Sequence, residues 1–177
     1  MIPDADAPVE TRWEGRYIAA KTRGRWEYVS RVRGIRAAAI LAIDDEGHAI
    51  LVDQYRVPLG RRSLELPAGL VGDEREGETV EVAAARELEE ETGYRPERIE
   101  VVGDFFSSPG MVSECFTLVR ASGLTRVGAG GGVAGEGITV HRVPLAEVPA
   151  YVAARRAEGW GIDVKLLLLL AGSILAT

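Results

Sequence analysis

The sequence holds little of what several protein classes require. One cysteine, Cys115, and two histidines occur among its 177 residues. An internal disulfide is therefore excluded, and His48 and His141 lack the ligand spacing of a zinc site. No apolar run reaches the ~20 residues that cross a bilayer, and the amino terminus lacks the residue order of a signal peptide. We expect a cytoplasmic protein without a membrane partner, in which both histidines are structural.

Negative charge outweighs positive charge, with 27 Asp and Glu against 21 Lys and Arg. The formal net charge is −6, and neither a basic patch nor a basic helix is visible. We therefore expect a small-molecule substrate and no nucleic-acid partner. With 46% hydrophobic and 27% charged residues, the chain has the composition of a globular domain. We expect a loose N-terminal arm over residues 1–12 and a single domain over residues 13–177.

Hydrophobic periodicity and turn residues predict alternating strands and helices. We expect an antiparallel pair from Arg16–Ala20 and Trp26–Arg33, and a buried hairpin from Ala37–Ile43 and Ala49–Tyr55. A short strand at Leu64–Leu66 precedes a helix from Thr79 to Glu91 that Gly93 ends. The remaining predicted elements are strands at Ile99–Phe106, Cys115–Arg120 and Ile138–Pro144, helices at Leu145–Glu158 and Val164–Ala176, and a long mobile loop at Gly128–Gly137. This order predicts an α/β/α sandwich with a mixed sheet.

The predicted helix carries an acidic cluster on its apolar side. At 100° per residue, Ala83, Ala84, Glu87 and Glu91 share one stripe with Val80, and Glu90 lies beside it. Buried carboxylates cost several kcal/mol each unless a cation compensates them. A divalent metal such as Mg²⁺, which takes oxygen ligands and phosphates, would compensate them. The alternative is a solvated acidic helix face.

The spacing of this cluster resembles a known family signature. Gly72, Glu78 and the run from Arg86 to Tyr94 form the pattern Gx5Ex7REUxEExGU. This pattern resembles the signature of the Nudix hydrolases. The resemblance implies a Nudix-type α/β/α sandwich, here with an additional N-terminal antiparallel strand pair. It also implies Mg²⁺, or Mn²⁺, held by Glu87, Glu90, Glu91 and the Ala68 carbonyl, with Arg86 orienting the carboxylates.

Motifs outside the signature resemble the ADP-ribose and nucleotide-sugar branch of this family. Pro109 follows Gly93 by 109 − 93 = 16 residues, the spacing typical of that branch. The resemblance implies substrate contacts from Arg56, Glu65, Pro109 and Glu114. For the residues alone, a simple Pro-Gly turn and exposed strand-end charges remain alternatives.

Two further segments resemble functional parts of the same branch. The glycine-rich stretch 130–138 resembles a loop that carries a catalytic glutamate, which makes Glu136 the candidate general base, although Gly137 stands where related GDP-mannose hydrolases usually have Asp. An ordinary surface glutamate is the alternative. Arg25, Trp26 and Glu27 resemble a segment that holds the nucleobase across a dimer, so we expect the strands within residues 13–35 at a homodimer interface. A core position for Trp26 is the alternative.

These motifs together predict Mg²⁺-dependent hydrolysis of a nucleoside diphosphate sugar. ADP-ribose, cleaved to AMP and ribose 5-phosphate, is the first candidate substrate, and GDP-mannose or another nucleotide sugar is the alternative. A hypothesis of another class is a non-catalytic nucleotide-sugar sensor. An enzyme for oxidised nucleoside triphosphates or RNA caps would share the signature but gives no reason for the Pro109 spacing.

Overall fold

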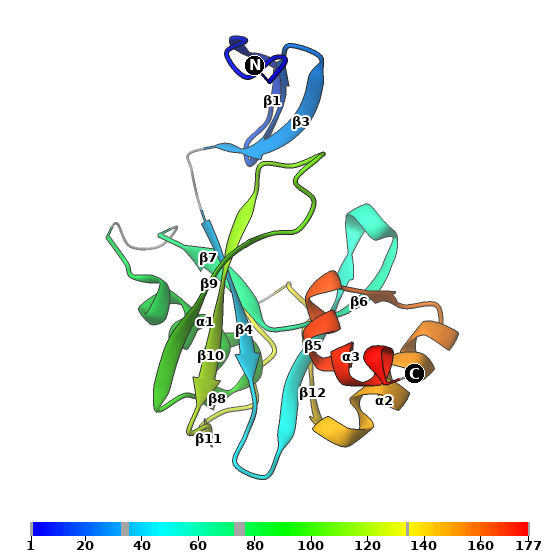
Figure 1. Ribbon diagram of the computed structural model, residues 1–177. Helices are drawn as coiled ribbons and strands as arrows, with labels where there is room; N and C mark the ends of the chain where they lie inside the picture. The colour runs from blue at the N-terminus through cyan, green and yellow to red at the C-terminus, as the bar shows by residue number, and fades with distance from the viewer. Residues whose placement is uncertain (1, 33–35, 73–76, 134, 177) are drawn as a thin grey trace.

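The computed structural model describes residues 2–32, 36–72, 77–133 and 135–176 (Figure 1). Two four-stranded sheets form the body, with strand orders β7-β4-β10-β9 and β12-β5-β6-β13. Their strands are β4 (Arg36–Ala42), β5 (His48–Arg56), β6 (Arg61–Glu65), β7 (Ala68–Val71), β9 (Arg98–Phe106), β10 (Cys115–Ser122), β12 (Thr139–Pro144) and β13 (Gly161–Ile162). The helices are α1 (Val80–Thr92), α2 (Val148–Ala157) and α3 (Leu167–Leu175), with 3-10 turns η2 (Val57–Leu59), η3 (Leu145–Glu147) and η4 (Val164–Leu166).

The core has two sides because side chains alternate along the central strands. Ala39 of β4 and Leu51 of β5 pack with α2 and α3, whereas their neighbours Ile40 and Ile50 pack with Leu88 of α1. The sheets are mixed, since β4–β10 and β6–β13 are parallel and the other pairs are antiparallel. The predicted α/β/α sandwich with a mixed sheet is confirmed. In the described part of the chain, no helix is both long and apolar enough to cross a membrane.

The predicted buried hairpin is wrong in its pairing, although both of its strands are buried. β4 pairs with β7 and β10, and β5 pairs with β6 and β12, so the two strands lie in different sheets. A single bridge, Ile43 to Ala49, joins them where the chain turns. Continuous apolar runs indicate burial on both faces but carry no information about the partner strand.

The N-terminal segment forms a separate three-stranded sheet rather than a pair. Its strands are β1 (Val9–Glu14), β2 (Ile18–Arg23) and β3 (Trp26–Arg31), and Figure 1 shows this sheet projecting from the body. Residues 9–12, which we expected in a loose arm, therefore belong to β1. All six residues of β1 are exposed, so hydrophobic burial gave no signal for this strand.

The helix that carries the acidic cluster is confirmed to within one residue at each end. The Thr79 side chain accepts a hydrogen bond from the Val82 N–H at the start of α1, and Gly93, with φ of 73°, ends it in the left-handed region. A short pair, β8 (Tyr94–Arg95) with β11 (Thr125–Arg126), follows the helix. Both helix ends therefore follow from local capping chemistry.

Candidate active site

The acidic residues of α1 differ in exposure. Glu91 is buried, with 7% of its surface exposed, whereas the Glu90 side chain is 40% exposed. Glu87 packs against β7 so closely that a Cβ on Gly69 would lie 2.0 Å from its carboxyl carbon. The acidic residues of the helix therefore extend from its exposed side to its packed side, as the helical period predicts.

Arg86 binds several of these acids at once. Its guanidinium lies 3.0 Å from Glu87, 3.3 Å from Glu78 and 3.4 Å from Glu90. The Glu78 side chain is buried, and that of Arg86 is nearly so. Arg86 and Glu90 lie four residues apart on the helix, a spacing at which side chains meet, but Glu87 lies closer. Arg86 therefore holds the carboxylates of the signature in place relative to one another.

Glu91 is the most strongly perturbed of the acids. Burial raises the pKa of its carboxyl to about 8, an effect that the Ala68 N–H bond opposes and that the charges of Glu87 and Glu136 increase. The charge of Arg56 lowers the same pKa. These cations and donors are thus too few to stabilise the ionised form at this position.

This donor set fits a hard divalent cation. Carboxylate oxygens are the ligands that Mg²⁺ and Mn²⁺ prefer, and a cation here would offset the burial that raises the Glu91 pKa. Among the described residues, no three His, Cys, Asp or Glu side chains already stand at metal-binding spacing. Instead Arg86 bonds Glu87 and Glu90, and the Ala68 N–H donates to Glu91 over 3.1 Å.

The glycine-rich loop is fixed to the end of α1. The Gly131 N–H donates to the Glu91 carbonyl over 2.8 Å, and the Gly132 N–H donates to the Glu90 carbonyl over 3.1 Å. The last carbonyls of a helix have no partner within it, so the loop satisfies them. We expected a mobile loop here, and the structure shows one that is hydrogen-bonded to the helix bearing the acids.

This loop brings Glu136 into electrostatic range of Glu91, because the Glu136 charge contributes to the raised Glu91 pKa. The Oε2 atom of Glu136 accepts a hydrogen bond from the Val133 N–H over 2.9 Å. Gly132 leaves room for this carboxylate, since a Cβ there would lie 2.1 Å from Oε2. A candidate base and the acidic face of α1, far apart in sequence, are thus neighbours.

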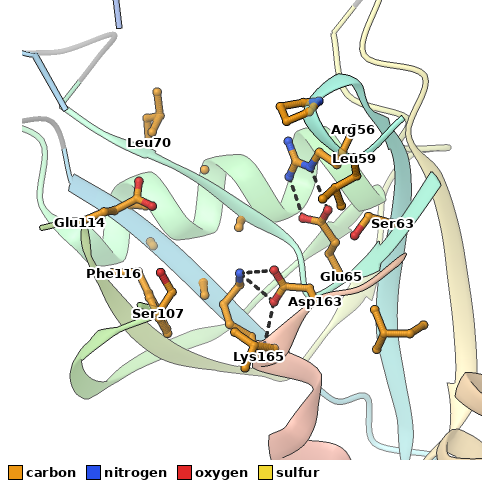
Figure 2. A pocket seen from close by; sticks show the side chains of 18 of the residues that line it. Arg56, Leu59, Ser63, Glu65, Leu70, Ser107, Glu114, Phe116, Asp163 and Lys165 are labelled. Carbon is orange, nitrogen blue, oxygen red and sulfur yellow. Dashed lines mark hydrogen bonds and ion pairs between the residues drawn. The ribbon is translucent and has the colours of Figure 1, made fainter. Parts of the chain in front are cut away.

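A pocket of about 700 Å³ lies beside β7, and α1 runs behind it (Figure 2). Strands β4, β6, β7 and β10 contribute to its walls, together with the segment that leads into α3. Its charged lining residues are Arg31, Arg56, Glu65, Glu114, Asp163 and Lys165. Such a mixture of cations and acceptors suits a ligand with both phosphates and hydroxyl groups.

Arg56 and Glu65, both predicted substrate contacts, form a fixed pair in this pocket. Arg56 donates from Nε and Nη2 to the two Glu65 oxygens, over 2.8 and 2.6 Å. The Glu65 side chain is buried, and its hydrogen bond raises the pKa of Arg56. Glu65 therefore orients the guanidinium, whose charge also acts on Glu91.

The structure adds pocket residues that sequence reasoning missed. Arg31 of β3 pairs with the predicted residue Glu114, and the Lys165 ammonium pairs with Asp163 over 2.8 Å. Arg31, Asp163 and Lys165 come from opposite ends of the chain. No local motif surrounds them, so only the folded arrangement reveals them.

The remaining predicted substrate contacts do not line this pocket in the single chain. Pro109 and Trp26 line a smaller pocket of about 310 Å³ between the N-terminal sheet and the loop before β10. Arg25 forms an ion pair with Asp4 over 2.8 Å, and Glu27 pairs across the hairpin with Thr22. Within one chain, these residues do not line the pocket that holds Arg56.

Comparison with known proteins gives a family match over most of the chain. A family model described as NUDIX domain matches residues 33–159. The methanol dehydrogenase activator of Bacillus methanolicus is 37% identical over 126 residues, which cover 71% of this chain and 66% of that protein. The ADP-ribose pyrophosphatase of Bacillus subtilis (strain 168) is 43% identical over 89 residues, covering 50% of this chain and 46% of that protein. The matched segments thus span about half to two thirds of these relatives.

A solved structure is similar over nearly the whole chain. A crystal structure of an ADP compounds hydrolase superimposes with a TM-score of 0.70 and covers 96% of this chain and 92% of that one. The sequence identity is 24%, so this likeness concerns the fold alone.

Proposed function

The chain belongs to the NUDIX domain family, and from this premise we propose that it hydrolyses the diphosphate bond of a nucleoside diphosphate sugar with the help of Mg²⁺. ADP-ribose is the substrate we propose first. Water adds to one phosphorus atom, one bridging P–O bond breaks, and the products are AMP and ribose 5-phosphate.

One observation carries this proposal. The buried Glu91 carboxylate lies near Glu87 and Glu136, with its pKa raised to about 8, beside a pocket of about 700 Å³ that holds Arg56. A site that keeps several acids together against their mutual repulsion gains most from a ligand that brings divalent cations. A diphosphate ester with bound Mg²⁺ is such a ligand.

The roles of the chain's own residues follow from their positions. Glu87, Glu90 and Glu91, with the Ala68 carbonyl, would hold the metal, and Arg86 would orient these carboxylates. When bound, the metal neutralises charge on the diphosphate and makes nearby water more acidic. Glu136 removes a proton from the attacking water, a role that its place beside the acidic face supports.

The pocket supplies the remaining contacts. Glu65 occupies the Nε–Nη2 edge of Arg56, so the diphosphate would meet the Nη1 edge of the guanidinium. Glu114 would accept hydrogen bonds from a sugar hydroxyl. We further propose a homodimer in which Arg25, Trp26 and Glu27 of one subunit and Pro109 complete the base-binding side of the site.

Turnover of ADP-ribose tests this proposal. Purified protein with ADP-ribose and Mg²⁺ should release AMP, and chelation of the metal should stop the reaction. Glu136→Gln should lower kcat by about 100-fold or more, with KM little changed, because the base acts in the transition state. Glu81→Gln, an exposed substitution on α1, serves as the control.

The outcomes separate the competing functions. Binding of ADP-ribose without AMP release would indicate a sensor. If GDP-mannose is cleaved faster than ADP-ribose, the proposed reaction stands and the proposed substrate changes. A Glu136→Gln variant as fast as the wild type would remove Glu136 from the mechanism.

A further inference from the structure

A buried polar network lies on the α2–α3 side of the second sheet and has no part in the mechanism above. Its centre is Asp53 of β5, whose side chain is 1% exposed. One Asp53 oxygen accepts from the Nε atom of Arg62, and the other lies 2.6 Å from the Nε2 atom of His141. A buried carboxylate is costly unless it is fully paired, so this one depends on both partners.

Arg62 reaches from this network to the loop of Glu136. It starts on β6 and extends past Asp53 on β5, which is paired in register with Thr139 at the start of β12. Its Nη2 atom donates to the Thr139 hydroxyl over 3.1 Å and lies 3.3 Å from the Gly137 carbonyl. One guanidinium thus spans three strands and ends on the residue next to Glu136.

The other side of Asp53 is held equally firmly. His141 lies between Asp53 and Tyr151, with its Nε2 atom 2.6 Å from the Asp53 carboxyl and its Nδ1 atom 2.9 Å from the Tyr151 hydroxyl. Burial raises the pKa of Tyr151. Trp160 lies under the Arg62 guanidinium at 5.9 Å. Asp53 and Arg62 therefore have little freedom to move.

We propose that Arg62, fixed by Asp53, is a positioning residue that sets the place of Glu136 through the Gly137 carbonyl. The glycine-rich loop is then held at two points, by α1 at Gly131 and Gly132 and by Arg62 at Gly137. Gly137 has a φ of 61°, a left-handed conformation that favours glycine. This inference rests on the proposed role of Glu136 as base.

Two substitutions at Arg62 test the proposal. Arg62→Lys keeps a charge beside Asp53 but cannot also span to Gly137 and Thr139, and Arg62→Gln removes the charge as well. We expect kcat for ADP-ribose with Mg²⁺ to fall about 10- to 100-fold in both, with KM within about twofold, because a displaced group costs rate more than binding. Arg61→Gln, an exposed neighbour on the same strand, should match the wild type.

A double-mutant cycle identifies the residue through which Arg62 acts. If Arg62 positions Glu136, Arg62→Lys should change the rate less than about twofold in a Glu136→Gln background. The full loss in that background, or an unchanged kcat in Arg62→Lys alone, would overturn the proposal.

Hydrogen exchange separates this proposal from the proposed function. The amides of residues 135–138 should exchange faster in Arg62→Lys than in the wild type, while those of α1 remain protected. Unchanged exchange at residues 135–138 would overturn the positioning role even if the enzyme is active. If the wild type does not cleave ADP-ribose but the loop exchanges faster in Arg62→Lys, the proposed substrate is wrong and the role of Arg62 in holding the loop is retained.

Discussion

At the residue scale, the site is built around a carboxyl group that the fold destabilises. The pKa of Glu91 rises from 4.5 to about 8, mainly because burial disfavours the charged form. Between these two values the folded state binds more protons than the unfolded state, so stability falls as the pH rises through this window. Without metal, Glu91 thus lowers the stability of the protein at neutral and mildly alkaline pH.

Replacing this acid with its neutral isostere should stabilise the metal-free protein. We expect Glu91→Gln to raise the free energy of unfolding by about 2 to 4 kcal/mol at pH 8 and by much less at pH 4.5, where the Glu91 carboxyl of the folded protein is already protonated. Urea unfolding in the presence of a chelator at both pH values measures this difference. The same variant should lose ADP-ribose turnover by orders of magnitude.

The matched control is Glu81→Gln, an exposed substitution in the first turn of α1, whose effect on the free energy of unfolding should differ by less than about 1 kcal/mol between the two pH values. Millimolar Mg²⁺ should stabilise the wild type and the control but not Glu91→Gln. Equal stability of Glu91→Gln and wild type at pH 8 would contradict the buried, uncompensated charge.

The sequence predicts the residues of α1 better than those of the pocket, for a physical reason. Glu87, Glu90 and Glu91 share one helix, so a period of 3.6 residues is enough to bring them together. Arg31 and Lys165 reach the pocket only because β3 and the segment before α3 fold against the same strands. Local sequence patterns do not indicate that these distant residues come together.

At the element scale, α1 and the glycine-rich loop form one unit. The loop amides bond the last carbonyls of the helix, and Gly130 lies so close that a Cβ there would be 2.4 Å from the Thr92 carbonyl carbon. Only glycine permits this backbone contact, which joins the loop that carries Glu136 to the helix.

Gly130→Ala should detach the loop from the helix. Gly130, at φ of 70°, and Gly47, at φ of 77°, both lie in the left-handed region, where adding a Cβ lowers the free energy of unfolding by about 1–2 kcal/mol. A Cβ on Gly47 meets nothing within 4 Å, so Gly47→Ala measures the cost of the left-handed conformation alone. We expect Gly130→Ala to cost about 1 to 3 kcal/mol more because of the added clash, and to lower kcat as well.

Thermal unfolding and turnover of the two variants decide this point. Gly47→Ala should keep the wild-type kcat. If Gly130→Ala matches Gly47→Ala in both stability and kcat, the contact between loop and helix does not set the position of Glu136.

Elements were easier to predict than their pairing. The caps of α1 lie within its own sequence, at Thr79 and Gly93, and this helix was predicted to within one residue. The hairpin of β4 and β5 was not, because β4 is completed by β10, which lies more than 70 residues further along the chain. Parallel pairing of distant strands leaves no local signature.

At the scale of the whole molecule, the N-terminal sheet carries large apolar side chains that the rest of the chain does not cover. It meets the body through the hydrogen bonds of Val29 with Met111 and Ser113, each 2.9 Å long, and through the Arg31–Glu114 pair. Large apolar side chains on it remain exposed, including Trp13 at 55% and Trp26 at 56%. Exposed aromatic side chains of this size are typical of protein interfaces.

We therefore expect a homodimer of 2 × 19.1 = 38.2 kDa in which this sheet contacts the second subunit. Light scattering on a sizing column measures the mass of the protein in solution. Trp26→Ala should shift this mass toward the monomer. It should also raise KM for ADP-ribose more than it lowers kcat, because base contacts act on binding.

The control is Ile174→Ala, which removes an equally exposed apolar side chain from α3 and should leave both mass and KM unchanged. A second exposed apolar surface, around Phe105, Phe106 and Leu168, competes as the interface. If Phe106→Asp dissociates the dimer and Trp26→Ala does not, that surface joins the subunits, and the base must be bound by residues of a single chain.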